Sequence, residues 1–572
     1  MRALLTLLLI VCVQTVRADP TEVELLDALK KRAPDKFVAL RQNEKADAPI
    51  VGLFGDLADA PADGKQMHGV RDFVQTYGSL LGYPAGGWPA EFSVPDFISP
   101  TGGSLSLVFV PNKDGKIWPG GAVGFHFDRD KKLVAVTSRY KKMGAVGAGN
   151  LDAAAAVQKA LESLRQKHTV ELSSDGVLWQ FLGEADDGSL KPLYRVEVVV
   201  GEGGVPVQVL LDASGTVLCT RAGGHRFDAD GLAYDGYPVT ADNLREPMKR
   251  LDDVLSGRKH YPLVGEVFRA KSSAYNKARS TNGHFEFPTS FVMTFDSGTK
   301  RRLSHPRYLE TSMYFHLMQA YDKAMALGAK ELDVPFEDGS TAKPVITFDP
   351  WTRPDDMDRG STVDNAYYKH ADKGMHFAWY NPSYEFRQAA ADPSVIYHEY
   401  GHAVHYRLNP FWTGVTFTPQ ELGDSGAIGE GFADYFSMLV SGGSSTAEIF
   451  LGSKDARHAS LTPDYCHLVP IYDSADVECN VEKGGTTEIH PAGQLFSGLA
   501  MRLTQSGKEQ LGKDEAESAT RVFEAMRITF PTTFRQWALS VMAVQMRSGD
   551  ATKLPALVAL WREAGLFKEC GK

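Results

Sequence analysis

The stretch DPSVIYHEYGHAVHYRL at residues 392–408 decides the fold of this chain of 572 residues. It contains two histidines and a glutamate in an H-E-x-x-H pattern. In a helix, positions four apart lie nearly on one face, about 6 Å apart along the axis. His398 and His402 can therefore hold one cation between them, while Glu399 reaches the same site from beside them. This pattern is typical of zinc hydrolases.

The sequence around the pattern favours a helix with defined ends. Asp392 is a suitable N-cap, and Pro393 suits the first helical position because no partner is needed there for its missing N–H. Pro410 ends the helix. A second helical run follows from the glycine-rich cluster DSGAIGEGFADYF at residues 424–436 and ends near Gly442.

The order of these two segments resembles the thermolysin/fungalysin group of zinc metalloendopeptidases, and the fungalysin pattern more closely. The resemblance implies that one zinc ion is bound by His398, His402 and Glu430. It implies that Glu399 is the general base. Asp434, one turn after Glu430, would accept the second N–H of a ligand histidine and fix its orientation.

Two further segments match the same group in the expected order. IHPAGQ at residues 489–494 opens an amphipathic helix, and the resemblance makes His490 the candidate that donates to the oxyanion of the transition state. DNAYY at residues 364–368 resembles the edge strand that binds the substrate backbone, which implies substrate contacts from Asn365 and Ala366.

The resemblance also bears on the substrate pocket, on calcium binding and on the fold class. An arginine is expected beneath the S1′ pocket, and Arg457 is the candidate. The acidic run that builds a double calcium site in thermolysin is replaced here by SGGSS at residues 441–445, so calcium is left open. The expected fold class is α+β: a two-lobed, thermolysin-like domain with a β-rich N-lobe, a helical C-lobe and zinc in the cleft, preceded by an α+β propeptide.

The chain divides into four expected segments. Strands at 122–128 and 132–139, and a helix at 151–166 capped by Asn150, resemble parts of the propeptides of this group. The expected boundaries are a signal peptide at 1–18, a first propeptide subdomain at 19–145, a second at 146–225 and the zinc metallopeptidase domain at 226–572. The propeptide would act as an intramolecular inhibitor until it is cleaved near residues 220–245.

The start of the chain predicts export. Arg2 precedes an apolar run at residues 3–13, and Ala18 ends an acceptable cleavage site, which together indicate a secretory signal peptide. The expected location is extracellular or periplasmic. Cys466 and Cys479 are the candidate disulfide pair, whereas the pairing of Cys219 and Cys570 is left open.

Composition excludes some partners. With 43% apolar residues, 23% charged residues and a net charge of −10, neither nucleic-acid binding nor a membrane association is expected. Proteins or peptides are the expected substrates. Two alternatives are an exopeptidase on the same fold and a zinc-stabilised binding or adhesion protein without turnover. The presence of Glu399 argues against the latter, because a structural zinc site needs no base.

Overall fold

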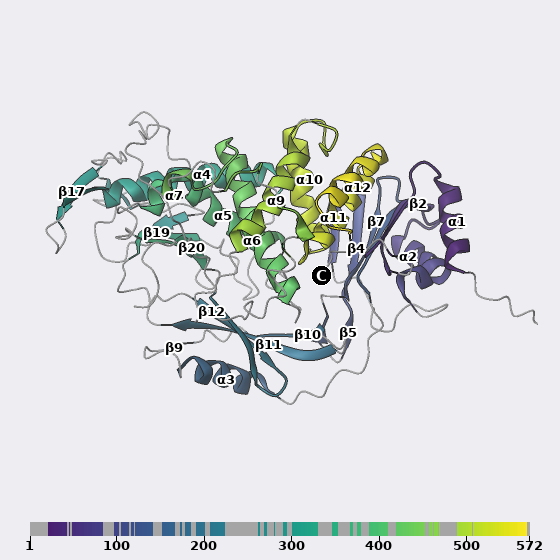
Figure 1. Ribbon diagram of the computed structural model, residues 1–572, viewed down its shortest axis with the longest axis horizontal. Helices are drawn as coiled ribbons and strands as arrows, with labels where there is room; N and C mark the ends of the chain where they lie inside the picture. The colour runs from purple at the N-terminus through teal and green to yellow at the C-terminus, as the bar shows by residue number, and fades with distance from the viewer. Residues whose placement is uncertain are drawn as a thin grey trace, which may run out of the picture.

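The computed structural model describes residues 21–140, 151–222 and 261–568, apart from shorter stretches within these ranges, of which the longest are 84–96, 330–345, 353–365 and 469–488. Figure 1 shows β-sheets built from the first part of the chain around a helical C-terminal region. The fold is therefore a mixed α+β fold with a helical C-terminal part, as the sequence predicts.

The N-terminal part is an antiparallel sheet of six strands in the order β1-β2-β8-β7-β4-β3. Two helices, α1 and α2, and the short 3₁₀-helix η1 belong to the same part. The predicted strands at 122–128 and 132–139 are confirmed as β7 and β8. The bounds are α1 Glu22–Arg32, β1 Val38–Arg41, β2 Ile50–Ala58, α2 Gln66–Tyr77, η1 Gly78–Leu81, β3 Phe97–Thr101, β4 Ser104–Phe109, β7 Val123–Phe127 and β8 Leu133–Ser138, with a small hairpin of β5 Asn112–Lys113 and β6 Lys116–Ile117.

A second sheet follows, covered by one helix. The predicted helix is confirmed, although the residue seen to cap it is Asp152, whose Oδ1 accepts from the N–H of Ala155, rather than the expected Asn150. Ala156, Ala160 and Leu164 share one face of this helix and are buried against the sheet. The bounds are α3 Ala153–Arg165, β9 Leu172–Ser173, β10 Leu178–Glu184, β11 Leu190–Val200, β12 Pro206–Asp212 and β13 Val217–Ala222.

The next part contains a mixed sheet in the order β15-β19-β21-β20 and a long helix, α4. Strands β15, β19 and β21 run parallel, and β20 pairs with β21 antiparallel at the end of the sheet. The bounds are β14 Tyr261–Pro262, β15 Phe268–Ala270, β16 Arg279–Ser280, β17 Ser290–Thr294, β18 Lys300–Ser304, α4 Pro306–Ala326, β19 Ile346–Thr352, β20 Ala366–Lys369 and β21 Gly374–Ala378.

Among the described residues that follow, helices predominate. Helix α5 has the predicted ends: Asp392 is its N-cap and accepts from the N–H of Ser394, and Pro393 occupies its first turn. Helix α6 ends next to Gly442, which adopts φ +69°. The bounds are η6 Ala389–Ala391, α5 Pro393–Leu408, α6 Pro419–Ser441, α7 Glu448–Leu451, α9 Ile489–Thr504, α10 Glu515–Ile528, α11 Phe534–Arg547, η7 Ala551–Lys553 and α12 Leu554–Glu563.

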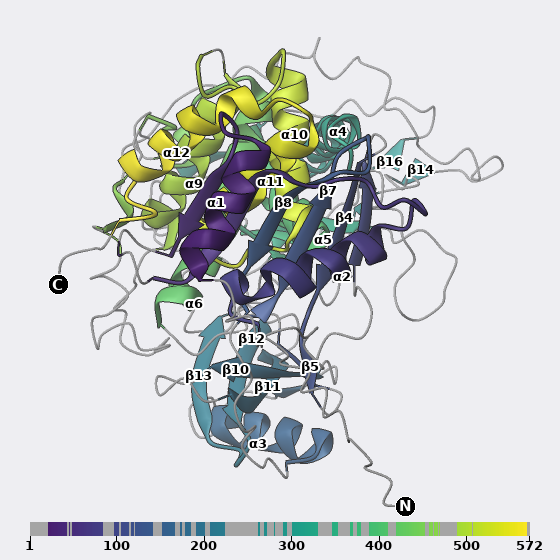
Figure 2. The same ribbon diagram turned by 90° about the vertical axis from the view of Figure 1, so that its right-hand side faces the viewer.

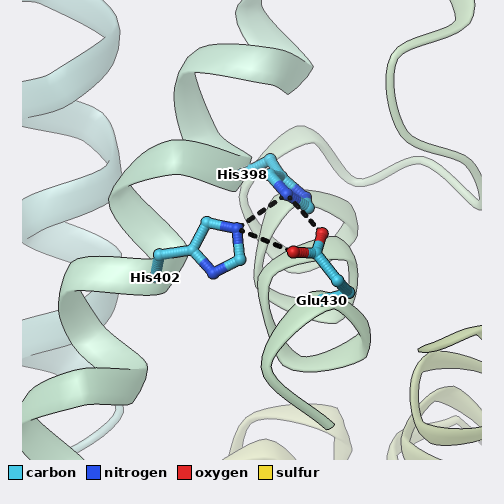
Figure 3. A group of neighbouring side chains, drawn as sticks. All are labelled: His398, His402 and Glu430. Carbon is cyan, nitrogen blue, oxygen red and sulfur yellow. Dashed lines mark hydrogen bonds and ion pairs between the residues drawn. The ribbon is translucent and has the colours of Figure 1, made fainter. Parts of the chain in front are cut away.

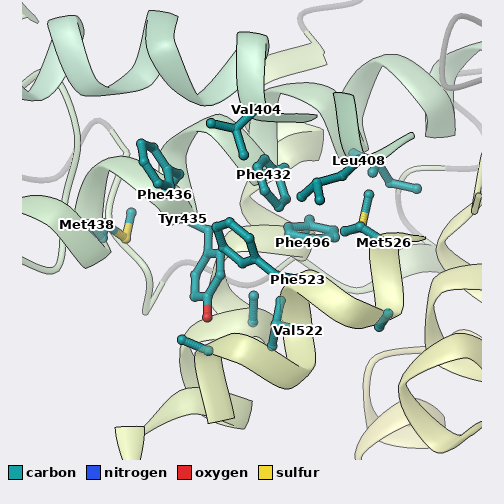
Figure 4. Packing of buried hydrophobic residues seen from close by; sticks show 14 of the residues in the cluster. Val404, Leu408, Phe432, Tyr435, Phe436, Met438, Phe496, Val522, Phe523 and Met526 are labelled. Atoms are coloured by element: carbon teal, nitrogen blue, oxygen red, sulfur yellow. The ribbon is translucent and has the colours of Figure 1, made fainter. Parts of the chain in front are cut away.

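An aromatic core holds helices α5, α6, α9 and α10 together (Figure 4). Phe432 of α6 lies at its centre, with ring centroids 6.1 Å from Phe496 of α9 and 5.2 Å from Phe523 of α10. Such tilted aromatic pairs stabilise by about 0.5–1.5 kcal/mol beyond the area they bury. The core therefore fixes the mutual positions of the helices that carry the H-E-x-x-H and E-x-x-x-D motifs.

Glycines allow these helices to approach at backbone distance. A Cβ on Gly431 of α6 would lie 2.2 Å from the carbonyl oxygen of Gly493 of α9, and a Cβ on Gly401 of α5 would lie 2.9 Å from the Cα of Ala433. Each motif thus contains a glycine at the point where its helix crosses a neighbour. No larger residue fits without separating the helices.

We predict that Gly431→Ala destabilises the protein by about 3 kcal/mol, since overpacking against rigid backbone lies at the high end of the usual range. Gly443→Ala is the matched control, because a Cβ there meets the side-chain hydroxyl of Ser441 at 3.3 Å and backbone only at 3.9 Å. The midpoint of thermal unfolding should fall for the first variant alone. Equal midpoints would show that α6 and α9 can separate without cost.

Candidate metal centre

Three buried side chains from two helices converge at one point (Figure 3). His398 and His402 extend from successive turns of α5, and Glu430 faces them from α6. Nε2 of His398 lies 3.0 Å from Nε2 of His402 and 3.3 Å from Oε2 of Glu430. Nε2 of His402 lies 3.7 Å from Oε1 of Glu430.

This triangle fits a tetrahedral zinc ion. Ligand atoms 2.0–2.2 Å from a tetrahedral zinc are about 3.3–3.6 Å apart, close to the three separations given above. The donor set of two imidazoles and one carboxylate is also that of a catalytic zinc site with its fourth position open. The side chains of His398 and Glu430 are fully buried, so a cation here would be largely removed from water.

Asp434 orients one member of the triangle. Its Oδ1 lies 2.8 Å from Nδ1 of His398 and accepts from Nη1 of Arg457 at 3.1 Å. Burial opposes ionisation of Asp434, but Arg457 and His398 outweigh it and lower its pKa below 3.8. The ionised carboxylate holds the imidazole with Nε2 directed at the triangle.

The same charges act on His398. Burial disfavours the charged ring, but Asp434 and Glu430 outweigh burial and raise its pKa to about 9. The ring therefore carries a proton at neutral pH until a cation displaces it.

Glu399 has a different environment. Its side chain is fully buried, and neither carboxylate oxygen has a hydrogen-bond partner among the described residues. Burial, with a contribution from Glu430, raises its pKa to about 8, although His398 and Arg457 act in the opposite direction. A buried carboxylate without a partner is costly, and it is tolerated where its partner is a water or a substrate. A carboxylate with a raised pKa and open hydrogen-bonding capacity can exchange a proton with a bound water near neutral pH.

His490 comes to the site from a third helix. It lies in the first turn of α9, and its Nε2 is 3.0 Å from Oε2 of Glu430. The backbone contact of Gly431 with Gly493 brings α9 this close. His490 therefore lies beside the ligand set, next to the carboxylate of Glu430, and its contact with a substrate stays a prediction.

The other expected site residues are only partly described. Ala366 is buried in β20 and pairs with Phe377 of β21, at the end of the mixed sheet. Asn365 lies outside the described residues. Cys466 forms a disulfide, but its partner is not among the side chains that the structure describes, and the pairing with Cys479 stays a prediction.

Arg457 has a contact that the sequence did not indicate. The side chain is buried and pairs with Asp434, so it supports the orientation of His398 from behind. No local pattern in the sequence indicates this role, because Arg457 lies in a turn 23 positions after Asp434, which belongs to α6.

Comparison with known proteins agrees with the geometry. Residues 265–453 match the model of the fungalysin metallopeptidase family (M36). This region is of the fungalysin type. The matched residues include both histidines, Glu399, Glu430 and Asp434, while Arg457 and His490 lie beyond the match.

The fungalysin match supports a metallopeptidase that hydrolyses peptide bonds, and the His398–His402–Glu430 group fits the zinc ion on which this family depends. No curated protein matches the chain. Among solved structures, the Bacillus megaterium YpeB C-terminal domain matches at 8% identity, covering 36% of this chain and 98% of the other, with a TM-score of 0.18. A similarity of that size supports no conclusion about fold or function.

We predict that Asp434→Asn lowers zinc affinity about 10- to 100-fold, because the amide no longer holds the His398 ring as an anion does. Competition of the metal-stripped protein with a chromophoric chelator measures the change. Asp63→Asn, an exposed carboxylate far from the site in sequence, serves as the control. Unchanged affinity in Asp434→Asn would show that the carboxylate does not orient the ligand.

Proposed function

We propose that this chain is an exported zinc metalloendopeptidase that is synthesised as a zymogen. The observation that supports it best is the pairing of a ligand triangle with a carboxylate: His398, His402 and Glu430 fit one zinc ion, and Glu399, which has no hydrogen-bond partner among the described residues, lies beside them. A site that only stabilised the fold would have no use for a buried carboxylate of raised pKa.

The ligands and their supports would act as follows. Zinc in this site would supply Lewis acidity, which activates water near pH 7 and polarises the scissile carbonyl. His398 and His402 would hold the ion through Nε2, and Asp434 with Arg457 would keep His398 in the required orientation. Glu430 completes the ligand set from α6.

Proton transfer falls to Glu399. It would take a proton from the attacking water and deliver it to the leaving amine, which needs a group that changes its protonation near neutral pH. His490 would donate to the developing oxyanion from α9. A single donor in that position typically contributes about 3–4 kcal/mol to the transition state.

Substrate binding would use the end of the mixed sheet. Strand β20 lies at that end and contacts α5, so a peptide added beside it would run past the metal site. Asn365 and Ala366 would hold the substrate backbone in register, a mode of recognition that suits cleavage within a chain. Arg457, expected beneath the S1′ pocket, is proposed to act instead through Asp434.

We predict that Glu399→Gln lowers casein hydrolysis by about 10²- to 10⁴-fold while zinc remains bound, because only the proton acceptor is lost. A chelator should abolish hydrolysis by the unmodified protein. Glu515→Gln, in the first turn of α10, is the control. Full hydrolysis by Glu399→Gln would refute the base, and no hydrolysis by the unmodified mature protein would favour a binding protein without turnover. Products from a peptide blocked at both ends separate internal cleavage from exopeptidase activity.

The N-terminal sheet and the second sheet are proposed as the propeptide, with the boundaries 19–145 and 146–225. The contact that supports a role in folding is between the N-terminal sheet and α11: Phe54 and Ala135 of the sheet belong to the same core as Leu539 and Val541 of the helix. The N-terminal sheet thus completes the core of the helical part.

Export is proposed from the leader at 1–18, and fungalysin-type proteins are typically secreted. None of the helices in the described ranges combines the length and the apolar character that crossing a membrane requires.

We predict that the exported protein appears first with Asp19 at its N-terminus and later with a new N-terminus between residues 220 and 245. N-terminal sequencing over time, with assays of hydrolysis on the same samples, measures both steps. Activity should rise with the second species. Full activity in a protein that still begins at Asp19 would show that the front half is a retained accessory domain.

A further inference from the structure

The two faces of the N-terminal sheet differ in chemistry. One face presents large apolar residues such as Phe109 and Phe125 to the core shared with α1 and α2. Along β4, β7 and β8 most intervening residues are small or polar, and they face α11, whereas Phe54 of β2 adds a large apolar side chain to the same face. The small or polar residues include Ser104 and Ser106 of β4, Gly124 and His126 of β7, and Thr137 of β8. Figure 2 shows α1 and α2 in front of the sheet and α11 behind it.

Arg547, at the end of α11, connects the helix to this polar face. Its guanidinium donates to Oγ of Ser104 at 2.8 Å and to Oγ of Ser106 at 2.9 Å. It also pairs with Glu524 of α10 at 2.9 Å, and its side chain is only 2% exposed. A buried charge therefore joins two parts of the chain that are more than 400 positions apart in sequence.

His126 lies directly behind this contact. The side chain is fully buried, with Nδ1 2.7 Å from Oγ of Ser106 and Nε2 3.2 Å from Oγ1 of Thr137. Ser106 accepts from Arg547, so its own hydrogen is free to be donated to Nδ1 of His126. This arrangement is satisfied by the neutral ring with its proton on Nε2, which donates to Thr137.

A protonated ring would be destabilised in the same place. Nδ1–H could donate to the second lone pair of Ser106 Oγ, but two positive charges would then lie on either side of one buried hydroxyl. Burial, and secondarily the charge of Arg547, hold the pKa of His126 well below 6.5. There is also little room to rearrange, since a Cβ on Gly124 would lie 2.7 Å from Nε2 of His126.

The other groups around the junction do not compensate for the added charge. Ser106 and Thr137, on the strands that flank β7, are uncharged. On the helical side, Arg547 faces the ring from α11. Glu524 and Arg527 of α10 act on Arg547, with opposite effects on its pKa. The negative charge of Glu524 thus compensates the positive charge of Arg547 and would not compensate a charge on His126.

We propose that His126 makes the contact between the N-terminal sheet and α11 an acid-sensitive latch, which is closed while the ring is neutral and opens when the ring is protonated. Opening separates the polar face of the sheet from α11. Once separated, β7 and α11 lose the packing that protects their backbone amides, whereas α1 and α2 keep their own core with the other face of the sheet. This inference concerns the interface alone and does not depend on the proposed peptidase activity.

The direction of the pH dependence follows from linkage. In the closed state the ring is neutral well below pH 6.5, whereas a ring exposed by opening titrates near its ordinary value of about 6.5. Above that pH the two states bind the same number of protons, and the latch is at full strength. As the pH falls below about 6.5, His126 binds a proton in the open state but stays neutral in the closed state. The equilibrium constant for opening should then rise up to about tenfold per pH unit.

Hydrogen exchange of the full chain tests the proposal. A Glu399→Gln background keeps the chain intact, and exchange is measured from pH 8 to pH 5 with correction for intrinsic rates. Amides of β7 and α11 should show an opening constant that is flat above pH 6.5 and rises about tenfold per unit below it. With His126→Gln, which stays neutral, the rise should disappear. His68→Gln, an exposed histidine on α2 of the same part, should behave like the parent.

Two results would overturn the latch: opening that is independent of pH in the parent, or the same rise in the His126→Gln variant. Should that variant fail to fold, exchange of the histidine C2 hydrogens in the unaltered sequence gives the titration of His126 directly. We expect that the His126 ring does not titrate near pH 6.5 while the interface is closed. At lower pH the ring should become protonated at the same pH at which the interface opens. An ordinary midpoint in a protein whose β7 and α11 remain protected would refute it.

Discussion

The backbone contact between α5, α6 and α9 is the constraint on which the rest of the site depends. Gly401 and Gly431 remove the side chains that would hold these helices apart, and the crossing at Gly493 brings α9 against α6. Only at this spacing can a carboxylate from α6 reach two imidazoles from α5 and a third imidazole from α9. The aromatic core around Phe432 then keeps the spacing fixed, because close-packed interiors resist small displacements.

The charged side chains near this contact form a series in which each one pairs with the next. Arg457 pairs with Asp434, Asp434 holds His398, and His398 faces Glu430. Each buried charge in this series has an opposite charge or a hydrogen-bond partner, which is the condition under which buried ions are tolerated. Glu399 differs from the series, since the described residues offer it no hydrogen-bond partner. The same burial that makes it costly also raises its pKa toward neutrality, where proton transfer is most effective.

The N-terminal sheet shows how distant segments share one core. Its strands place large apolar residues on one face for α1 and α2, while the other face packs Phe54 and a set of small or polar residues against α11. The helical part is therefore covered by residues from the opposite end of the chain. The polar junction at Arg547 and His126 gives this contact a dependence on protonation that a purely apolar interface would lack.

The sequence by itself determined the local features. Asp392 and Pro393 set the start of α5 through capping and ring geometry, and the four-residue spacing of His398 and His402 requires that they share a face. Strands β7 and β8 and helix α3 also lie within the ranges expected from the sequence. Tertiary structure alone decided which distant groups meet. The convergence of Glu430 with the histidines, the pairing of Arg457 with Asp434, and the burial of His126 against Arg547 depend on how helices and sheets pack. Such contacts arise from the shape of the whole core, and no short window of sequence encodes them.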